Sequence, residues 1–373
     1  MRGTGLFRDP TVLRREWPLF VSGVTTALFY AFGSRWFADL ANGFWFAFLL
    51  AWLFTGILLS ALAVVRHAEQ LAGRLGEPLG TLILTLAVTG MEVMMIAAVM
   101  YTGTGNAAFA RDAMFAVVMI VMNGMVGLTL VLGGLRHHEQ NYNLQGANAF
   151  LAVIVPITVL CLVLPNFTLS SPGPTYSALQ SVFLVVMSVA LYGVFLAIQN
   201  LRHRDYFVAP GSSGRVEAHA ENFRSVPYHG ALLLAHLLPV ILLAKQLAVP
   251  INYGIHELSA PAALGGLLVS TLVLFPESIG AVRAALANEL QRSVNILLGS
   301  VLATISLTIP AVLVIGLATG REIVLGLDAV NMILLVLTLA VSTLTFASAR
   351  TNVLLGAVHL LLFLAYLMMV FDR

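Results

Sequence analysis

The feature that most constrains the fold is a series of long apolar runs, each about long enough to cross a bilayer. The hydrocarbon core is roughly 30 Å thick, so one helical crossing takes about 20 mostly apolar residues. Of the 373 residues, 59% are hydrophobic and only 10% are charged, more apolar than a soluble domain. Candidate spans are found at residues 17–34, 43–65, 79–101, 112–134, 148–166, 177–199, 229–248, 262–283, 293–318, 326–347 and 353–371. We therefore predict an all-α polytopic membrane protein with about eleven transmembrane helices.

The first run is the least regular of the eleven, because Gly33, Ser34 and Arg35 end it early. Without it, ten spans remain. Arg14 and Arg15 precede it, as basic residues precede the apolar region of a signal peptide, but no small-residue cleavage site follows. We expect a retained span.

The basic residues predict the orientation. If the eleven runs cross in turn, 14 of the 19 basic residues lie on the side of the amino terminus. The positive-inside rule places that side in the cytoplasm and the carboxyl terminus outside. We predict four parts: a leader with the first helix at 1–42, a five-helix repeat at 43–199, a cytoplasmic linker loop at 200–228 and a second five-helix repeat at 229–373.

Two acidic residues differ from the other 15 in their surroundings. Glu92 and Glu277 lie near the middle of long apolar runs, whereas the others lie in or beside polar loops. A carboxylate at the bilayer centre costs several kcal/mol, so it persists mainly where it faces protein, water or a cation. The pair indicates a cation or proton pathway.

Each half of the chain carries one of these glutamates, and the flanking residues indicate an internal repeat. GTLILTLAVTGME at residues 80–92 aligns with GGLLVSTLVLFPE at residues 265–277, with glycine and glutamate matched at the ends. With a shorter loop in the second half, Arg111 then opens the next span as Arg292 does in the other copy. The same register continues into the following helix.

That register places Asn123 opposite Thr304. Two units of five spans each have an odd number of crossings, so the second copy is inverted relative to the first. Inverted repeats place their shared site near the midplane of the bilayer. The sequence therefore predicts that Glu92 and Glu277 converge on one site.

Both helices are expected to be interrupted or weakened next to the glutamate. Thr89 and Gly90 precede Glu92, and Pro276 precedes Glu277. A proline removes a backbone donor and frees a carbonyl upstream. Broken helix geometry at membrane depth is expected where it lines a cavity, so the freed carbonyls would serve as cation ligands.

Two ionised glutamates match the charge of one calcium ion or two protons, so cation and protons would compete and the carboxyls would titrate as a coupled pair. Calcium takes six to eight oxygens, so hydroxyls, carbonyls and water must complete the shell. The residues assigned to cation and proton binding are Glu92, Glu277, Thr89, Asn123, Ser278 and Thr304, with Glu92 and Glu277 as the metal ligands. The supporting candidates are Thr85, Ser270, Ser300, Thr308, His236 and His359.

These candidates also have structural interpretations. Serine and threonine hydroxyls in membrane helices often bond their own backbone or a neighbouring helix. Asn123 is costlier to bury without partners, so lining the site and packing are both retained. His236 and His359 are candidates for proton relay, although a hydrogen-bonded core histidine is the commoner case. Gly124 and Gly127 fit close helix packing.

Four stretches resemble the ChaA-type calcium/sodium:proton antiporters, in the cation/proton exchanger branch of the calcium:cation antiporter superfamily. The resemblance covers about residues 60–371 and is carried by LGEPLGTLILTLAVTGMEV, FPESIGAVRAALANELQRSVN, LLGSVLATISLTIP and ARTNVLLGAVHLLLFLAYLM. It implies two inverted five-span repeats, one central acid in each, and export of calcium, sodium or potassium in exchange for protons. By that likeness Glu92 and Glu277 are the two central acids.

The chain departs from the wider superfamily in two places. TGME and FPES stand where better-known exchangers have an asparagine just before each acid, so the coordination shell is not transferred atom by atom. The loop 200–228 lacks the acidic run that some ChaA-like chains carry. A calcium-gathering role of that loop is therefore not expected.

The sequence favours a secondary transporter over an enzyme, because it contains no nucleophile elbow, P-loop, HExxH motif or cysteine pair. No cofactor or nucleic acid is expected, and the partners are inorganic cations, protons and membrane lipid. Calcium is the expected cation because two carboxylates match a divalent charge. Sodium or potassium exchange on the same site, and a cation channel, are the alternatives. The expected location is the bacterial inner membrane.

Overall fold

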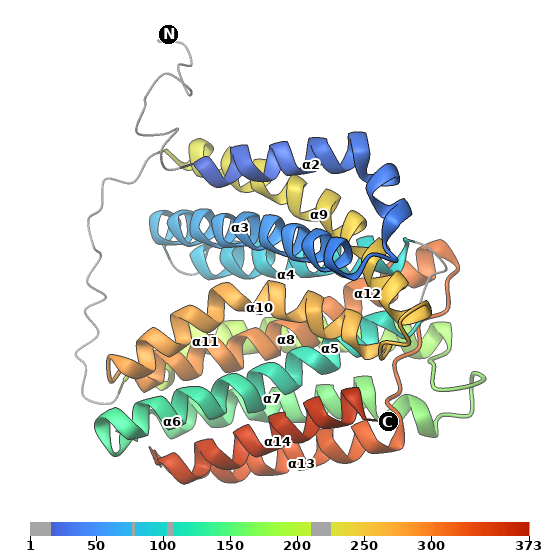
Figure 1. Cartoon of the computed structure of the whole chain (residues 1–373). Helices are drawn as coiled ribbons and strands as arrows, with labels where there is room; N and C mark the ends of the chain where they lie inside the picture. Colours follow the sequence, from blue (N-terminus) through green and yellow to red (C-terminus); the bar gives the residue numbers. More distant parts are fainter. Residues whose placement is uncertain (1–15, 77–78, 103–106, 210–224, 373) are drawn as a thin grey trace. The chain divides into compact units, whose positions relative to one another are not determined.

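A computed structural model describes residues 16–76, 79–102, 107–209 and 225–372. The basic pair Arg14 and Arg15, together with most of the predicted linker loop, lies outside the described residues. Figure 1 shows the helices along the chain.

Helices occupy all eleven predicted spans. In chain order the elements are α2 (Trp17–Trp36), η1 (Phe37–Asp39), α3 (Gly43–Leu75), α4 (Leu79–Met100), α5 (Phe109–Val118), η2 (Met119–Met125), α6 (Val126–His137), β1 (Gln140–Asn141), α7 (Leu144–Leu162), η3 (Leu164–Phe167), α8 (Ala178–Ala197), η4 (Ile198–Arg202), η5 (Arg204–Phe207), α9 (Val226–His256), α10 (Ala263–Leu286), α11 (Leu290–Ala303), η6 (Thr304–Thr308), α12 (Ile309–Thr319), α13 (Ala329–Thr345), β2 (Arg350–Thr351) and α14 (Val353–Phe371).

Among the described residues, nine helical stretches are long and apolar enough to cross a membrane. The two predicted spans outside this set are α13, which has only 17 residues, and α2. α2 has 20 residues and is about 30 Å long at 1.5 Å per residue, so its length suffices for a crossing. The all-helical polytopic fold is confirmed, and the number of crossings stays a prediction.

The helices form two compact units, and the first contains α2, α3, α4 and α9. α3 begins at Gly43 because the Asn42 side chain accepts hydrogen bonds from the N–H groups of Phe44 and Trp45, at 3.1 and 3.3 Å. α3 packs along α9 and α4, and α2 packs on α3 and α9. α3 and α9 are the first helices of the two predicted repeats.

Aromatic side chains join the carboxyl end of α2 to the beginning of α3. The Phe29 ring lies 5.3 Å from that of Trp36 and 5.2 Å from that of Trp52, both in edge-to-face geometry. The Trp45 indole Nε1–H donates to the Trp36 carbonyl at 3.0 Å. Aromatic side chains of this kind gather at membrane interfaces. They mark one end of the pair formed by α2 and α3, and the amino end of α2 lies at the other end of that pair.

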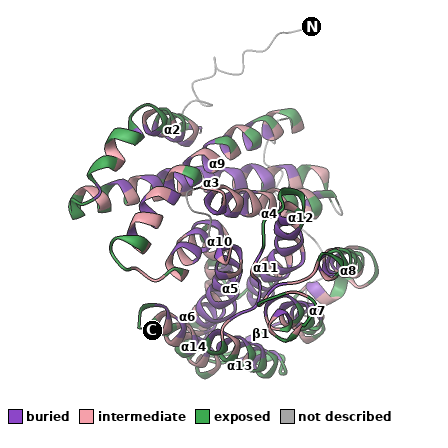
Figure 2. Cartoon of the chain, turned by 90° about the vertical axis from the view of Figure 1, so that its right-hand side faces the viewer, coloured by how far each residue is buried: buried purple, intermediate pink, exposed green. Residues whose placement is uncertain are grey.

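The second unit contains the remaining helices, from α5 to α8 and from α10 to α14. Its most buried spans are the continuous helical stretches Phe109–His137 and Leu290–Thr319. Of an 18-residue apolar stretch in each, 72% and 61% of the residues are buried. α14 packs on the first of these stretches and α8 on the second, and Figure 2 shows their buried residues. If the two predicted repeats are superposed, these two pairings correspond to each other.

The helices that carry the two central glutamates are continuous, so the expectation of interrupted helices at those points is wrong. α4 runs unbroken through Glu92, and α10 runs through Pro276 and Glu277. One proline removes a single backbone hydrogen bond, and the rest of the α10 ladder persists. The π-helical geometry lies elsewhere, in η2, η4 and η6, and η2 and η6 contain Asn123 and Thr304. The sequence register had placed these two residues opposite each other.

Hydrogen bonds between loops of the second unit follow the predicted alternation of crossings. On one side β1 and β2 pair antiparallel, with Gln140 opposite Thr351, and the Gln140 Nε2–H donates to the Ala285 carbonyl at 2.8 Å. On the other side the Val324 N–H donates to the Ala107 carbonyl at 3.1 Å. Each bond joins loops that the eleven-span topology puts on the same side.

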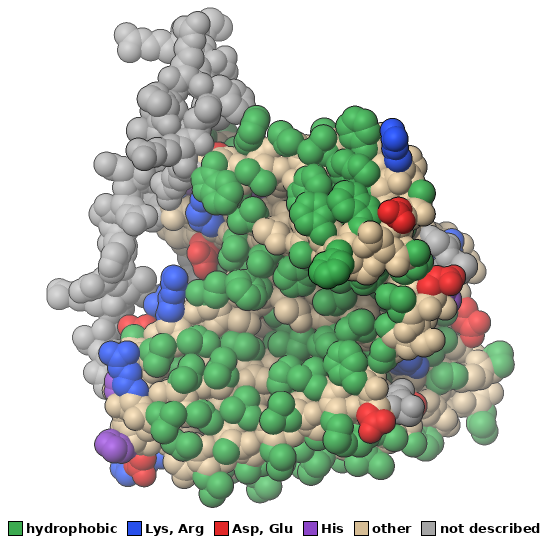
Figure 3. Space-filling view, in the orientation of Figure 1, with side chains coloured by type: hydrophobic (Ala, Val, Ile, Leu, Met, Phe, Trp, Pro, Cys, Tyr) green, Lys and Arg blue, Asp and Glu red, His purple; other side chains and the backbone are tan. Residues whose placement is uncertain are grey.

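The surface between the helix ends is apolar. In the space-filling view, hydrophobic side chains cover most of this face, and the charged side chains lie mainly near the helix ends (Figure 3). Leu169, Phe44 and Leu179 are among the large apolar side chains that are at least 80% exposed. Such exposure is expected where lipid replaces water as the solvent.

Candidate functional site

Glu92 lies near the middle of α4, in the first unit. Its side chain is buried, at 3% exposure, although the residue is acidic. Thr89 precedes it by three positions and is also buried, and Thr85 precedes it by seven and is partly buried. Because residues spaced by three, four and seven share one face of a helix, α4 presents one carboxylate and two hydroxyls on the same side.

Glu277 lies in α10, in the second unit, directly after Pro276, and is partly buried. Ser278 donates from its Oγ to the Leu274 carbonyl of the same helix at 2.8 Å. Ser270 shares the Glu277 face at a spacing of seven, and its Oγ donates across to the Ala113 carbonyl of α5 at 2.7 Å. Both hydroxyls therefore bond the backbone, as the structural interpretation expects, and their oxygens keep lone pairs that can accept.

α10 packs against α5, η2, α6 and α11, so the helix that carries Glu277 lies directly beside the π-helical segment η2. Thr304 and Thr308 are buried in η6, and Ser300 is partly buried in α11. A π-helical turn departs from the regular i to i−4 ladder and is frequent at functional sites. The second unit thus places the helix that carries Glu277 next to one stretch of irregular backbone, η2.

Asn123 and His359 meet in a buried hydrogen-bond network. The Asn123 Nδ2–H donates to the Thr338 hydroxyl at 2.8 Å, and the Asn123 Oδ1 lies 3.1 Å from the Nδ1 of His359. Because an amide oxygen only accepts, this Nδ1 carries the proton. The Nε2 of His359 then accepts from the Thr345 hydroxyl at 2.9 Å. All four side chains are at most 1% exposed.

This network fastens η2 to α13 and α14. His359 uses both ring nitrogens within it, as a hydrogen-bonded core histidine does. Asn123 uses both its oxygen and its nitrogen. A ligand role for Asn123 and a relay role for His359 stay predictions, and the contact between these two residues was not predicted from the sequence.

The network predicts that replacing one of two buried threonines, Thr338, lowers the stability of the protein more than replacing the other, Thr129. Thr338→Val leaves the Asn123 amide with only the weak Met119 sulfur acceptor at 3.6 Å, whereas Thr129→Val removes only a bond from the hydroxyl to its own helix at Val126. A buried donor that loses its partner costs about 1–3 kcal/mol. We expect thermal unfolding in detergent to show a clearly lower Tm for Thr338→Val than for the matched Thr129→Val. Equal Tm values would contradict a stabilising role of the network.

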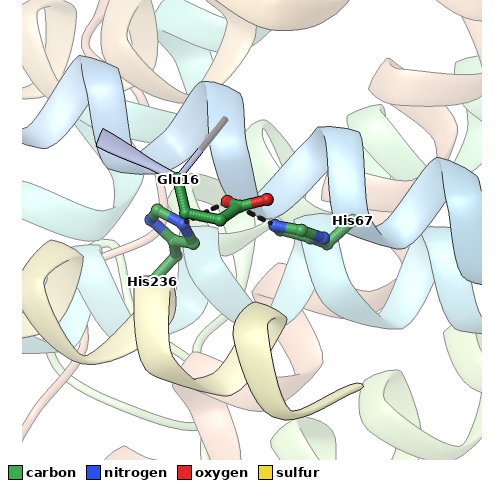
Figure 4. A group of neighbouring side chains, drawn as sticks. All are labelled: Glu16, His67 and His236. Carbon is green, nitrogen blue, oxygen red and sulfur yellow. Dashed lines mark hydrogen bonds and ion pairs between the residues drawn. The ribbon is translucent and has the colours of Figure 1, made fainter. Parts of the chain in front are cut away.

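His236 is buried on α9 in the first unit, where it lies next to Glu16 and His67 (Figure 4). The sequence analysis missed this group because Glu16 and His67 are at the margins of apolar runs. One signal was available. His229 and His236 are seven residues apart, which puts two histidines on one face of a membrane helix.

Comparison with solved structures shows a known transporter fold. The chain superposes on the structure described as native YfkE with a TM-score of 0.73, at 16% identity, covering 95% of this chain and 100% of that one. The structure described as the H+/Ca2+ exchanger CAX gives a TM-score of 0.63 at 15% identity, covering 95% and 88%. The fold is therefore that of the polytopic cation exchangers.

Sequence comparison places the chain within one family. The family model described as sodium/calcium exchanger protein matches residues 45–201 and 229–371, and the chain belongs to this family. The two matched stretches begin and end within a few residues of the two predicted repeats. The chain is accordingly a secondary active cation antiporter and not an enzyme.

Two curated relatives are similar over most of their length. The putative ionic transporter y4hA of Sinorhizobium fredii (strain NBRC 101917 / NGR234) is 46% identical over 316 residues, covering 84% of this chain and 86% of the relative. The sodium-potassium/proton antiporter ChaA of Escherichia coli (strain K12) is 41% identical over 325 residues, covering 85% and 87%.

Proposed function

We propose that the chain exports cytoplasmic calcium in exchange for protons by alternating access, and that Glu92 and Glu277 bind the cation and protons in competition. The observation that carries this proposal is the position of the two acids, each deep within a continuous apolar helix of a cation antiporter. Such placement is costly unless the carboxylate serves a cation or a proton.

The charge of the two carboxylates explains why transport would be an exchange. With calcium or two protons bound, the pair of glutamates is close to neutral and can pass through an occluded state. Empty, the pair would carry uncompensated charge and pay its desolvation cost. Return without cargo is therefore suppressed, and each outward step requires an inward one.

Sodium or potassium exchange is the second candidate. It is favoured by the 41% identity to a relative that is named a sodium-potassium/proton antiporter. Sodium, potassium and calcium all take oxygen ligands, and selection among them depends on the size, ligand number and rigidity of the site. The same two glutamates would serve either candidate.

We propose that the amino terminus and the loop 200–228 face the cytoplasm of a bacterial inner membrane. The positive-inside rule supports this orientation, because 14 of 19 basic residues fall on that side. Contacts between loops support the assignment of these basic loops to one side of the membrane. The pairing of β1 with β2 brings the segment after Arg136 together with that around Arg350, and both residues belong to the basic side.

Vesicles with an imposed pH gradient test the substrate. Inside-out membrane vesicles that contain the protein are acidified inside, and calcium, sodium or potassium is added while luminal pH is followed with a fluorescent probe. We expect calcium to cause proton efflux at the lowest concentration. Efflux with sodium or potassium but not with calcium would refute the calcium assignment and establish the second candidate. Large single-channel currents without proton counterflow would refute exchange altogether.

A further inference from the structure

The first unit contains a group of buried ionisable side chains that does not include the glutamates assigned to transport. Glu16 precedes α2, His67 lies on α3, and His229 and His236 lie on α9. The four side chains are 8%, 1%, 4% and 0% exposed. Four buried ionisable groups that meet from three helices call for a specific role.

Glu16, His67 and His236 direct their ligand atoms toward one point. The Glu16 Oε2 lies 3.2 Å from the Nε2 of His67 and 3.5 Å from the Nε2 of His236. Figure 4 shows the carboxylate between the two rings. The three ligand atoms all lie within 4.8 Å of one another.

We propose that Glu16, His67 and His236 form a binding site for a divalent transition metal of the zinc class. In a tetrahedral zinc site with bonds of about 2.0–2.2 Å, neighbouring ligand atoms are about 3.3–3.6 Å apart. The two measured separations from the carboxylate oxygen agree with this spacing. Two imidazoles and one carboxylate are also a common set of three protein ligands for zinc, with water as the fourth.

The surroundings of His67 and His236 suit metal ligation. The Nδ1 of His67 lies 3.0 Å from the Nδ1 of His229, and a proton shared on that side leaves the His67 Nε2 lone pair directed toward Glu16. Metal-bound histidines are typically held in this way through their second nitrogen. Among the described residues, the buried Nε2 of His236 has only the 3.5 Å contact with Glu16 and makes no regular hydrogen bond, so a metal at this nitrogen would satisfy it.

The positively charged Arg66 side chain contacts two of the proposed ligand atoms, where a metal ion would otherwise bind. Its Nη2 lies 2.6 Å from the Glu16 Oε2 and 3.3 Å from the His67 Nε2, which are two of the three ligand atoms. A guanidinium only donates, so both atoms present lone pairs to a positive charge. The Arg66 side chain is 31% exposed, so it is the most accessible member of the group. Arg66 is therefore a built-in competitor of the metal. A bound metal would tie the beginning of α2 to α3 and α9.

The test is metal binding to the purified full chain in detergent, with any affinity tag removed. Cobalt reports tetrahedral ligation by its visible absorption, and zinc affinity is measured by competition with a chromophoric chelator. We expect one metal ion per chain. Glu16→Gln and His236→Asn should each weaken zinc binding by more than about tenfold, since losing an outer partner alone costs about 10–100-fold.

Arg66→Gln should tighten zinc binding by about tenfold or more, because it removes a like charge a few ångströms from the metal. A misfolded variant would not gain affinity, so this result separates the proposal from a loss of structure. The matched control is His256→Gln, an exposed histidine near the other end of α9, which should leave zinc affinity unchanged.

Glu92→Gln separates this site from the transport site, and zinc binding should survive it. Loss of zinc binding in Glu92→Gln would place the metal at the transport glutamates and overturn the proposal. Absence of bound zinc in both the natural protein and Arg66→Gln would show that the group is an ion-pair network only.

Discussion

Glu92→Gln and Glu277→Gln are each expected to reduce cation-driven proton movement in inside-out vesicles to the level of vesicles without the protein. Glutamine nearly matches glutamate in size and still forms hydrogen bonds, but its amide neither ionises nor releases a proton. Each substitution removes one of the two charges that the cation neutralises. Exchange at the natural rate by either variant would remove that glutamate from the mechanism.

Two further variants sharpen this result. Glu92→Asp keeps the charge and withdraws the carboxylate by about 1.5 Å, one carbon–carbon bond. We expect partial exchange with weaker apparent cation affinity. The control is Glu139→Gln, whose carboxylate is 60% exposed and pairs with Arg350 at 3.4 Å. An exposed ion pair contributes about 0–1 kcal/mol, so exchange should be unchanged.

Gly127→Val is expected to destabilise the second unit severely. A side chain at Gly127 would place its Cβ 2.8 Å from the Leu360 nitrogen and 2.9 Å from the Gly356 oxygen of α14. Both are backbone atoms, which cannot turn aside as a flexible side chain can. Overpacking of this kind costs about 1–3 kcal/mol and in some cases more. We expect a low yield of folded protein and a Tm far below that of the natural chain.

The matched control is Gly193→Val in α8. A Cβ at this exposed helical glycine meets nothing within 4 Å. Because glycine is among the weakest helix formers, valine there should leave the Tm equal or slightly raised. Equal Tm values for the Gly127 and Gly193 variants would show that the close approach of α6 and α14 does not limit stability. The sequence analysis had assigned Gly127 to close helix packing, and the structure confirms this.

Much of the fold could be predicted because a bilayer imposes a strong local rule. A helix satisfies its own backbone in lipid, so long apolar runs mark helices without knowledge of their neighbours. Glu92 and Glu277 were equally visible in the sequence, because a charged residue within such a run is rare. The helix breaks were misplaced, since Pro276 is a local signal that the α10 backbone tolerates. The π-helical segments carry no residue type that marks them.

The candidate hydroxyls show where prediction from sequence ends. Ser270 and Ser278 both bond backbone carbonyls, but one reaches α5 and the other stays within α10. Along the sequence, both serines lie in the same mostly apolar helix, so the sequence does not distinguish them. Only the distance to a neighbouring helix decides which bond forms.

The amino-acid sequence alone determined the all-helical polytopic class, the places of the helices and the two acids within them, because each depends on the length and polarity of a single stretch of chain. The tertiary structure decided the partners. Asn123 meets His359 from 236 positions away, and His67 meets His229 from 162 positions away. Helix packing brings such residues together, and the spacing of residues along one helix contains no information about its neighbour.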